Sequence, residues 1–270
     1  MKLKVMNYNI LNGFCNGNPP YILDKKRMES AIKLIKSESP DILILTEAYF
    51  WPFAKKENLS NVKKIFEDLY GQYTSLAHDY FRWAPIVLSK FKIKDFNFSL
   101  SDFNLKFLRV NLDVNRKPIT MDVFHPHPDT TEKEKSNFLK RVLKKDKKNQ
   151  VLAGDFNALF MEDTYYKQKF SRGYESFMGS RGKSKAKDML KCLTIKTILK
   201  KKLIDTYKVK NKKFDYTIPT NLMSKNKDGS ARIDYIFCSK DFKVIDSGII
   251  KNELTEEASD HYPVYAVLEI

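Results

Sequence analysis

Short apolar segments of strand length alternate with segments of helical periodicity along almost the whole chain. The strand-like segments are residues 3–10, 41–48, 85–90, 107–114, 119–124, 151–154, 232–239, 242–250 and 263–270. The helix-like segments are residues 25–38, 61–70, 131–145 and about 185–202. This α/β interleaving, which includes a hairpin over 107–124, predicts helices packed outside mixed β-sheets. Because no linker or low-complexity tract interrupts the pattern, residues 1–270 are expected to form one domain.

Residue spacing marks two of the predicted helices clearly. In 25–38 the apolar side chains recur at i, i+3, i+4 and i+7, which is the pattern of an amphipathic helix. In 131–145, Thr131 and Glu134 have the spacing of a capping box at the start of the helix. Residues 160–183 show neither signal, and we predict a loop there.

Positive charge is concentrated in two parts of the chain. The formal net charge is +16, of which residues 140–148 carry +5 and residues 185–213 carry +9. This excess favours an anionic partner, and the two segments would form a groove for a phosphate polymer if they flank the active site. Lysine outnumbers arginine, the better bidentate phosphate ligand, so solvated helix faces in a lysine-rich chain are the competing explanation.

Cysteine usage and hydropathy bear on the compartment. Cys15, Cys192 and Cys238 lie far apart without paired spacing, so neither a disulfide framework nor a thiolate zinc site is indicated. A reducing, cytoplasmic setting is expected. The N-terminal segment has no signal-peptide pattern, and no apolar run approaches the ~18 residues that a membrane helix requires. We expect a monomer without a transmembrane segment.

Polar side chains of the kinds that bind metals and phosphates stand at or near the ends of the apolar runs. They are Asn9, Glu47, His125, Asp155, Asn157, Asp234, Asp260 and His261. In α/β proteins the ends of strands are where side chains from distant parts of the chain converge. Taken singly, Asp155 and Asn157 also suit an Asx-type turn. Glu47 is harder to explain structurally, because a carboxylate after "ILIL" is costly to bury unpaired.

The order of these motifs is more specific than any one of them. "NYNILNG", "LTEA", "FHPH", "GDFNAL", "RIDYIF" and "SDHYPV" resemble, in sequence and in order, the endonuclease/exonuclease/phosphatase superfamily. That group includes exonuclease III, abasic-site endonucleases, pancreatic-type deoxyribonuclease, neutral sphingomyelinases and inositol polyphosphate 5-phosphatases. The resemblance runs from Asn9 to His261. It implies a four-layered α/β/β/α sandwich, in which two mixed β-sheets are flanked by helices.

The resemblance also implies a reaction, the hydrolysis of a phosphate ester assisted by a divalent metal. Mg²⁺ is the expected cofactor, with Mn²⁺ as a substitute, since both accept oxygen ligands. Glu47 would be the principal metal ligand, and Asn9 and Asp260 would complete or orient the metal site. The metal would neutralise charge on the oxygens of the phosphorus and on the leaving oxygen.

The remaining motif residues would act on water and phosphate. Asp155 would position and deprotonate the attacking water, and Asn157 would hold a nonbridging oxygen. His261 would contact the phosphate while its other ring nitrogen bonds Asp234. His125 would stabilise charge in the transition state or assist the leaving group. For Arg232, a phosphate contact and a surface salt bridge are both open.

Three positions depart from the pattern of abasic-site endonucleases. Leu11 stands where many of them have an acidic or polar residue, and Thr46 where the family often has glutamine. The second metal contact of the family is therefore in doubt. His125 stands where those enzymes carry tyrosine, which favours the general nucleases and the sphingomyelinases.

"HPHPD", residues 125–129, suggests a different class of site, because H-x-H-x-D begins some binuclear zinc centres. Such a centre needs further histidines, and of the 4 in the chain His261 alone follows residue 128. The zinc hypothesis is therefore disfavoured. His127 is left as a loop residue or a secondary phosphate contact.

Three functions remain to be weighed. The first is a metal-dependent phosphodiesterase acting on DNA or RNA, to which the lysine-rich segments would be attracted. The alternative is a phosphatase or phospholipase C-type hydrolase acting on a small or lipid phosphate ester. Phe170 and Tyr174 in the predicted loop 160–183 would serve either, by stacking on bases or by entering a lipid interface. A catalytically inactive binding module is the third, and the complete set of polar motif residues opposes it.

Overall fold

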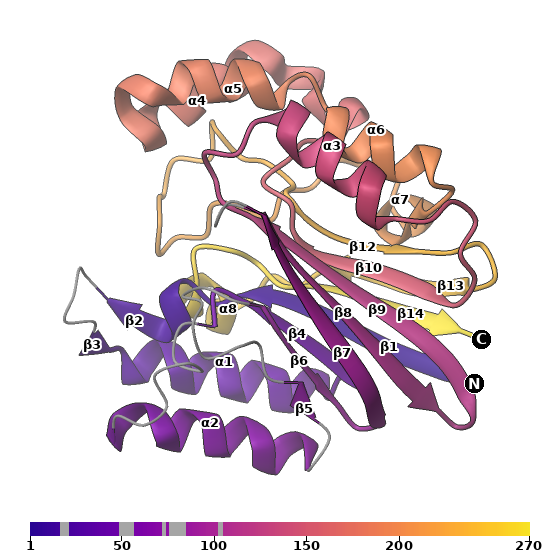
Figure 1. The fold of residues 1–270 in the computed structure, drawn as a ribbon. Coiled ribbons are helices and arrows are strands. Elements are labelled where there is room, and N and C mark those ends of the chain that lie inside the picture. Colours follow the sequence, from indigo (N-terminus) through magenta and orange to yellow (C-terminus); the bar gives the residue numbers. More distant parts are fainter. Residues whose placement is uncertain (17–21, 49–56, 72–73, 76–84, 102–104) are drawn as a thin grey trace.

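The computed structural model describes residues 1–16, 22–48, 57–71, 74–75, 85–101 and 105–270. Two β-sheets lie face to face, with helices on the outer side of each (Figure 1). The expected four-layered α/β/β/α sandwich is confirmed. Both termini lie at one end of the strands, and the strand ends that carry the motif residues lie at the other. No helix in the described part of the chain has both the length and the apolar character needed to cross a membrane.

The first sheet has six strands. In spatial order they are β13 (Lys243–Ile249), β14 (Val264–Glu269), β1 (Lys2–Asn9), β4 (Ile42–Thr46), β6 (Ile86–Ser89) and β5 (Thr74–Ser75). It is a mixed sheet, because β1 pairs parallel with β4 and antiparallel with β14. Its outer face is covered by α1 (Lys25–Glu38), α2 (Glu57–Tyr70) and α8 (Glu253–Ala258). A short hairpin of β2 (Cys15–Asn16) and β3 (Ile22–Leu23) follows the 3₁₀ turn η1 (Asn12–Phe14).

The second sheet also has six strands and is also mixed. In spatial order they are β11 (Ile204–Asp205), β12 (Asp234–Cys238), β10 (Gln150–Asp155), β9 (Lys117–Pro126), β8 (Leu105–Val114) and β7 (Lys92–Ser101). Here β10 pairs parallel with β9 and antiparallel with β12. Its outer face is covered by α3 (Glu132–Val142) and α6 (Leu193–Lys200), and α7 (Thr206–Lys210) lies beside β12 and β13.

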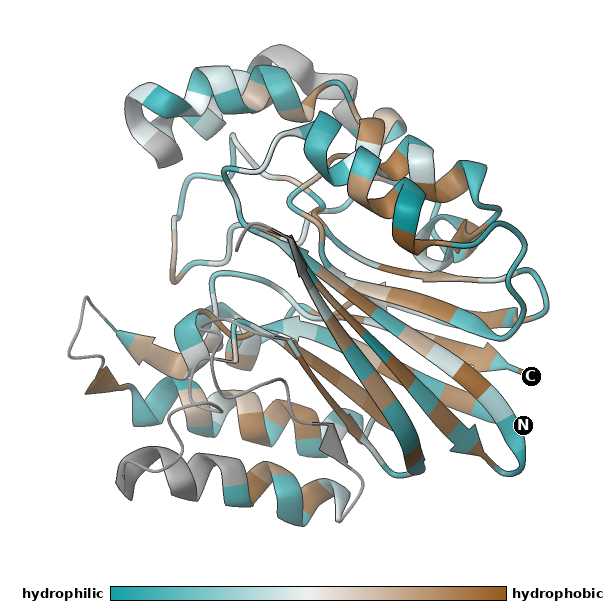
Figure 2. Ribbon diagram, viewed as in Figure 1, coloured by the Kyte–Doolittle hydropathy of each residue, from teal (hydrophilic) through white to brown (hydrophobic). Residues whose placement is uncertain are grey.

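Alternation along the strands divides their side chains between two cores. In β1, Leu3 and Val5 join the apolar layer between the sheets, whereas Met6 and Tyr8 pack under α1. In β10, Val151 and every second residue after it face the inter-sheet layer, and in β12 the same holds for Ile236 and its alternate neighbours. Figure 2 shows this apolar interior as brown bands that run along the strands of both sheets. A polar residue that continues the inter-sheet parity must therefore face the opposite sheet.

Two helix predictions hold closely. The helix predicted over 25–38 has these bounds in α1, and its apolar stripe packs on the first sheet. The capping box of α3 is also confirmed. Thr131 Oγ1 accepts from the main-chain N–H of Glu134, and the Glu134 carboxylate accepts from the main-chain N–H of Thr131.

The predicted loop at 160–183 is wrong. This part of the chain forms η2 (Met161–Tyr166), α4 (Lys167–Met178), η3 (Gly179–Arg181) and the start of α5 (Gly182–Met189). Phe170 and Tyr174 of α4 bury themselves against Ala186 and Met189 of α5, so tertiary packing overrides the weak local pattern. The single helix predicted over 185–202 is divided in two, because Cys192 adopts a left-handed conformation with φ 52° between α5 and α6.

Candidate active site

Strand parity brings polar side chains from both sheets together at one end of the inter-sheet layer. They belong to Asn9 at the end of β1, Lys106 on β8, His125 on β9, Asp155 at the end of β10 and Asp234 at the start of β12. Each continues a row of apolar residues at alternate positions, so each points between the sheets. Cross-strand register places Asp155 opposite Asp234 and Lys106 opposite His125. Four of these five are motif residues, and Lys106 is an addition.

Asn9 joins the two sheets at this site. Its Nδ2 donates to Glu47 Oε1 and to Asp155 Oδ2, each over 3.1 Å. Its Oδ1 accepts from the main-chain N–H of Leu11 at 3.0 Å, which fixes the orientation of the amide. The amide thereby holds a carboxylate of the first sheet and a carboxylate of the second sheet side by side.

Glu47 follows β4 in a backbone conformation that few L-residues adopt. Its φ is 58°, in the left-handed region, and its Oε2 accepts from the main-chain N–H of Asn12 at 3.0 Å. Strained backbone of this kind is found mainly where a side chain must be aimed at a site. Burial raises the pKa of Glu47, and the negative charge of Asp260 raises it further.

The glycine of "GDFN" is required by the neighbouring strand. Gly154 has a φ of 141°, and a Cβ at this position would lie 2.2 Å from the main-chain oxygen of Phe124. β9 therefore approaches β10 more closely than any side chain at 154 would permit. This close approach sets Asp155 directly beyond the glycine at the end of the strand.

Asp155 and Asn157 form a rigid turn after β10. Asp155 Oδ1 accepts from the main-chain N–H of Asn157 at 2.9 Å, as in an Asx turn, and Asn157 has a φ of 45°. The Asn157 side chain donates from Nδ2 to the carbonyl of Pro126 over 3.2 Å. The structural and the functional interpretation of this motif thus coincide, because the turn itself orients both side chains.

His261 and Asp234 form a buried pair beside Asp155. His261 Nδ1 lies 2.7 Å from Asp234 Oδ2, and His261 Nε2 lies 3.9 Å from Asp155 Oδ2. Burial alone would lower the pKa of His261, but the negative charges of Asp234, Asp260 and Asp155 together raise it well above its ordinary value. A cationic imidazole directed at the site is the result.

Asp155 is held in an environment unfavourable to its charge. Burial raises its pKa to about 7, with the adjacent Asp234 raising it as well and His261 acting in the opposite direction. A carboxyl group that titrates near neutrality can accept a proton from water and release it again within the physiological range. Asp155 can therefore exchange a proton near neutral pH.

Ligand-type atoms form two overlapping groups around Asp155. Glu47, His125 and Asp155 make one group, and Asp155, Asp234 and His261 make the other, with all ligand atoms of a group within 4.8 Å of one another. His125 Nε2 is 3.9 Å from Glu47 Oε1. Two carboxylates at close range, both with pKa values raised by burial, form a donor set that a divalent cation with oxygen preference would stabilise.

Asp260 lies beside this donor set without joining either group. Its Oδ1 accepts from Ser259 Oγ at 3.2 Å, and the same hydroxyl donates to the main-chain oxygen of Asn9 over 2.7 Å. The charge of Asp260 acts on Glu47 and on His261. The structure thus brings all eight predicted site residues to one end of the sandwich, with Asp260 at its periphery.

Arg232 has a structural role that differs from both predictions, a phosphate contact and a surface salt bridge. Its Nε lies 2.7 Å from Asp163 Oδ2 and its Nη2 lies 2.7 Å from Asp205 Oδ2, with 1% of the side chain exposed. Its guanidinium also stacks over the ring of Tyr235, 4.5 Å from the centroid. The salt bridge is therefore buried in the interior rather than on the surface.

The lysine-rich segment 140–148 does not flank the site. It begins in the last turn of α3 and leads into the start of β10, whereas Asp155 stands at the end of β10. Because a strand rises about 3.3 Å per residue, the start of β10 lies ~17 Å from Asp155. Lys201 lies at the same distal end, where its ammonium donates to the carbonyl of Leu143 over 2.5 Å. The groove expected from these charges is thus wrong for 140–148.

Three other lysines lie near the site, and no motif in the sequence singles them out. Lys106 is 5% exposed and shares the inter-sheet face with His125. Lys135 on α3 donates from Nζ to the carbonyl of Asn157 over 2.6 Å. Lys185 on α5 has an enclosed ammonium. The signal for Lys106 was its parity, since it stands two positions before the buried Leu108 in an otherwise apolar run.

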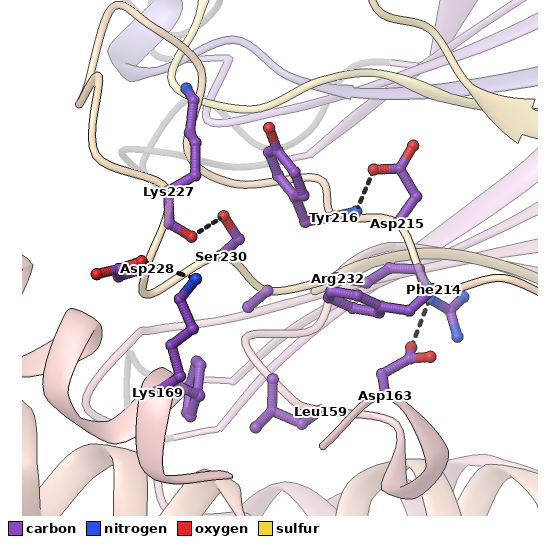
Figure 3. A pocket seen from close by; sticks show the side chains of 12 residues that line it. Leu159, Asp163, Lys169, Phe214, Asp215, Tyr216, Lys227, Asp228, Ser230 and Arg232 are labelled. Carbon is purple, nitrogen blue, oxygen red and sulfur yellow. Dashed lines mark hydrogen bonds and ion pairs between the residues drawn. The ribbon is translucent and has the colours of Figure 1, made fainter. Parts of the chain in front are cut away.

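A pocket of about 280 Å³ is lined by α4 and by residues 214–216 and 227–232 (Figure 3). Phe170 of α4 and the segment 214–216 form aromatic walls, and Lys169 and Lys227 line it together with Asp163, Asp215 and Asp228. Thr217 follows Tyr216 in the chain, and its Oγ1 accepts from the main-chain N–H of Asp234 at 3.2 Å. Arg232, which lines the pocket, stands two residues before Asp234 of the histidine–aspartate pair.

Comparison with known proteins bears on this arrangement. The model of the Endonuclease/Exonuclease/phosphatase family matches residues 6–261. No curated protein sequence matches the chain. An AP endonuclease from Archaeoglobus fulgidus has a similar structure, with a TM-score of 0.68, 17% identity, and coverage of 99% of this chain and 100% of that one. D. rerio TDP2 complexed with a single-strand DNA product is also similar, with a TM-score of 0.64 and 15% identity. The match covers 100% of this chain and 99% of that one.

A third structure carries a different chemistry in its name. ANGEL2, a 2′,3′-cyclic phosphatase in complex with adenosine-2′,3′-vanadate, has a TM-score of 0.60, 16% identity, and coverage of 99% of this chain and 95% of that one. At these identities the likeness concerns the fold. The family match, in contrast, spans the motifs from β1 to His261. With that match and the two-sheet site at the strand ends, the chain belongs to the endonuclease/exonuclease/phosphatase family.

Proposed function

We propose that this protein is a divalent-metal-dependent phosphodiesterase that hydrolyses DNA or RNA. The observation that carries the proposal is the position of Asp155, between the amide of Asn9 and the imidazole of His261, whose other nitrogen is held by Asp234. A base titrating near neutrality thereby stands beside both a cation-binding donor set and an anion-binding imidazole. Phosphate-ester hydrolysis needs these three elements together.

The chain's own residues would divide the work as follows. Glu47 would bind Mg²⁺, or Mn²⁺ in its place, with Asn9 orienting that carboxylate and Asp260 supporting the site from its periphery. When bound, the metal would neutralise charge on the phosphate oxygens. Asp155 would take a proton from the attacking water at its carboxylate.

Phosphate binding would fall to the imidazoles and to Asn157. His261 would donate from Nε2 to a nonbridging oxygen, because its Nδ1 is held by Asp234. Asn157 would donate to a second oxygen from a side chain fixed by its turn. His125 would offset the charge that develops on the leaving oxygen, from a position 3.9 Å from Glu47.

The substrate class is inferred from the surroundings of the site. The pocket lined by α4 has aromatic walls from Phe170, Phe214 and Tyr216. Its lining also holds three cations and three carboxylates, and Lys169 is paired with Asp228. Aromatic faces of this kind suit the stacking of nucleic-acid bases. The names of two similar structures, an AP endonuclease and TDP2 with a DNA product, support the same class. Three free, buried cysteines support a cytoplasmic setting.

A substrate panel tests the proposal directly. It would contain single- and double-stranded DNA, an abasic duplex, RNA, sphingomyelin and an inositol polyphosphate, each with Mg²⁺, Mn²⁺ or EDTA. We expect cleavage of nucleic acid that disappears with EDTA and falls by about 10²- to 10⁴-fold in Asp155→Asn. His261→Ala should lose activity as well. Activity confined to the lipid or the inositol phosphate would replace the nuclease with a phospholipase C-type enzyme or a phosphatase.

A further inference from the structure

Two lysines and a histidine beside the candidate site are unused by the proposed reaction. Lys106 lies on β8 and Lys185 on α5, and His127 stands in the loop after β9. His127 and Lys185 share a neighbour, because His127 Nδ1 lies 3.9 Å from Asp129 Oδ2 and Lys185 Nζ lies 3.8 Å from Asp129 Oδ1. Lys106 stands opposite His125, two residues before His127. Elements far apart in sequence therefore bring three nitrogen donors to the end of β9 that carries His125.

Lys106 is a buried cation without a partner. Its side chain continues the row of Leu108, Val110 and Leu112, so it points into the inter-sheet layer beside His125. Only 5% of the residue is exposed, and within the described part of the chain no acceptor or carboxylate pairs with its ammonium. Burial lowers the pKa of Lys106, and the charge of Glu47 offsets this without an ion pair being formed. The ammonium itself is not fully enclosed, so an anion that enters the site can reach it.

His127 presents a hydrogen-bond donor on the same side. Its Nδ1 accepts from the main-chain N–H of Asp129 at 3.2 Å, so the proton of the neutral ring lies on Nε2. The side chain is 42% exposed, so Nε2 is accessible. Of the two histidines in "HPHPD", His125 thus lies within the candidate site and His127 lies beside it.

Lys185 supplies a second fixed charge under this surface. Its ammonium has no hydrogen-bond partner, and the nearest carboxylate oxygen, Asp129 Oδ1, is 3.8 Å away. Asp129 is itself shared, since Arg181 Nη1 lies 4.0 Å from its other oxygen. Two cations, Lys185 and Arg181, thus lie beside the single carboxylate of Asp129.

We propose that Lys106 and His127, supported by the charge of Lys185, form a second anion subsite that binds a phosphate group neighbouring the one being cleaved. This inference rests on the proposed function and narrows its substrate class. A polynucleotide carries a phosphate on the adjacent nucleotide, whereas sphingomyelin has a single phosphate. The subsite would therefore favour nucleotides with two phosphates over esters with one.

The test compares ligands that differ by one phosphate. Binding of thymidine 3′,5′-bisphosphate and of thymidine 5′-monophosphate would be measured by titration calorimetry with Mg²⁺ present. One charge-assisted contact predicts about 10- to 100-fold tighter binding of the bisphosphate by the wild type. Lys106→Met should bring the two affinities together, and Lys106→Arg should preserve the difference. Lys187→Ala is the matched control, an exposed lysine on the same helix as Lys185.

A kinetic comparison separates the subsite from the reaction. The rate of p-nitrophenol release would be measured for thymidine 5′-(p-nitrophenyl phosphate) and for the same ester with an added 3′-phosphate. The isomer that carries the p-nitrophenyl ester at 3′ and the free phosphate at 5′ would be measured alongside. If neither ester nor isomer turns over but the binding difference stands and depends on Lys106, the subsite holds and the proposed function fails. Equal affinities in the wild type, or equal losses for both ligands in Lys106→Met, would overturn the subsite.

Discussion

Lys135 Nζ lies 2.6 Å from the main-chain oxygen of Asn157 and 2.7 Å from Glu132 Oε1, with 1% of its side chain exposed. A buried ion pair at the start of α3 therefore holds the turn that carries Asn157. Glu132 also accepts from the main-chain N–H and hydroxyl of Thr194 on α6. Contacts from α3 and α6 thus fix the turn that orients Asn157 in the candidate site.

Lys135→Met should destabilise the fold because it leaves Glu132 buried without its cation. Removing one partner of a buried pair costs about 3–5 kcal/mol of unfolding free energy. Urea denaturation followed by circular dichroism measures it. Lys133→Met, at an exposed position on the same helix, is the control and should change stability by less than ~0.5 kcal/mol. Equal effects of the two variants would contradict the role given to Lys135.

Asp155 should make the stability of the metal-free protein depend on pH. Its folded-state pKa of about 7 lies above the unfolded value near 3.9, so the folded protein retains a proton that the unfolded chain releases between these values. The free energy of unfolding should therefore fall as pH rises from about 4 to about 7. The raised pKa of His261 acts in the same direction above its ordinary value.

The variant Asp155→Asn isolates the contribution of that carboxyl group. In EDTA its stability relative to wild type should be greater at pH 8 than at pH 5, because the ionised carboxylate of the wild type is then unfavourably buried. Urea denaturation at the two pH values gives the comparison. Asp68→Asn, at an exposed position, should show no such pH effect. A difference between wild type and Asp155→Asn that is the same at both pH values would refute the raised pKa.

Arg232→Met should affect stability rather than substrate affinity. The substitution leaves Asp163 and Asp205 in the interior without the guanidinium that lies 2.7 Å from each, and a loss of about 3–5 kcal/mol is expected. Thermal and urea unfolding would measure it, with the exposed Arg172→Met as control. A rise in KM without a loss of stability would show that Arg232 contacts substrate after all.

The lysines distal to the site should contribute little to turnover of a short substrate. Lys140, Lys145 and Lys200 line a groove of about 300 Å³ between α3 and α6. The end of the segment 140–148 that joins β10 lies ~17 Å from Asp155, whereas charges are screened over about 8 Å at 0.15 M salt. The triple alanine variant should therefore change kcat/KM on a short oligonucleotide by less than about 2-fold. A 10-fold loss at that ionic strength would place the substrate over this groove.

The sequence predicted most where local chemistry and tertiary role coincide. "GDFN" marks its strand end because Gly154 must accept the close approach of Phe124, and because Asp155 closes a turn on the N–H of Asn157. The alternation of apolar residues was enough to place strands and the two amphipathic helices. Residues whose role follows from such short-range geometry could be found without a structure.

Other features depend on contacts that no local pattern encodes. The helices over 160–183 form because Phe170 and Tyr174 bury themselves against α5, which is an outcome of packing. The position of Lys106 in the site cannot be predicted from its local sequence. It depends on the face of β8 to which the side chain points and on the pairing of Lys106 with His125 of β9. The charge of 140–148 was visible, but its distance from the site depended on which end of β10 it joined. Long-range pairing, rather than composition, determined each of these outcomes.

The amide of Asn9, which bonds Glu47 of one sheet and Asp155 of the other, makes the site a reporter of folding. Neither sheet contains a complete set of site residues. A partly folded form in which the two sheets are not packed together therefore lacks an active site. Activity should therefore be regained during refolding no earlier than the burial of the inter-sheet layer. A time course of turnover would consequently measure the docking of the two halves of the sandwich.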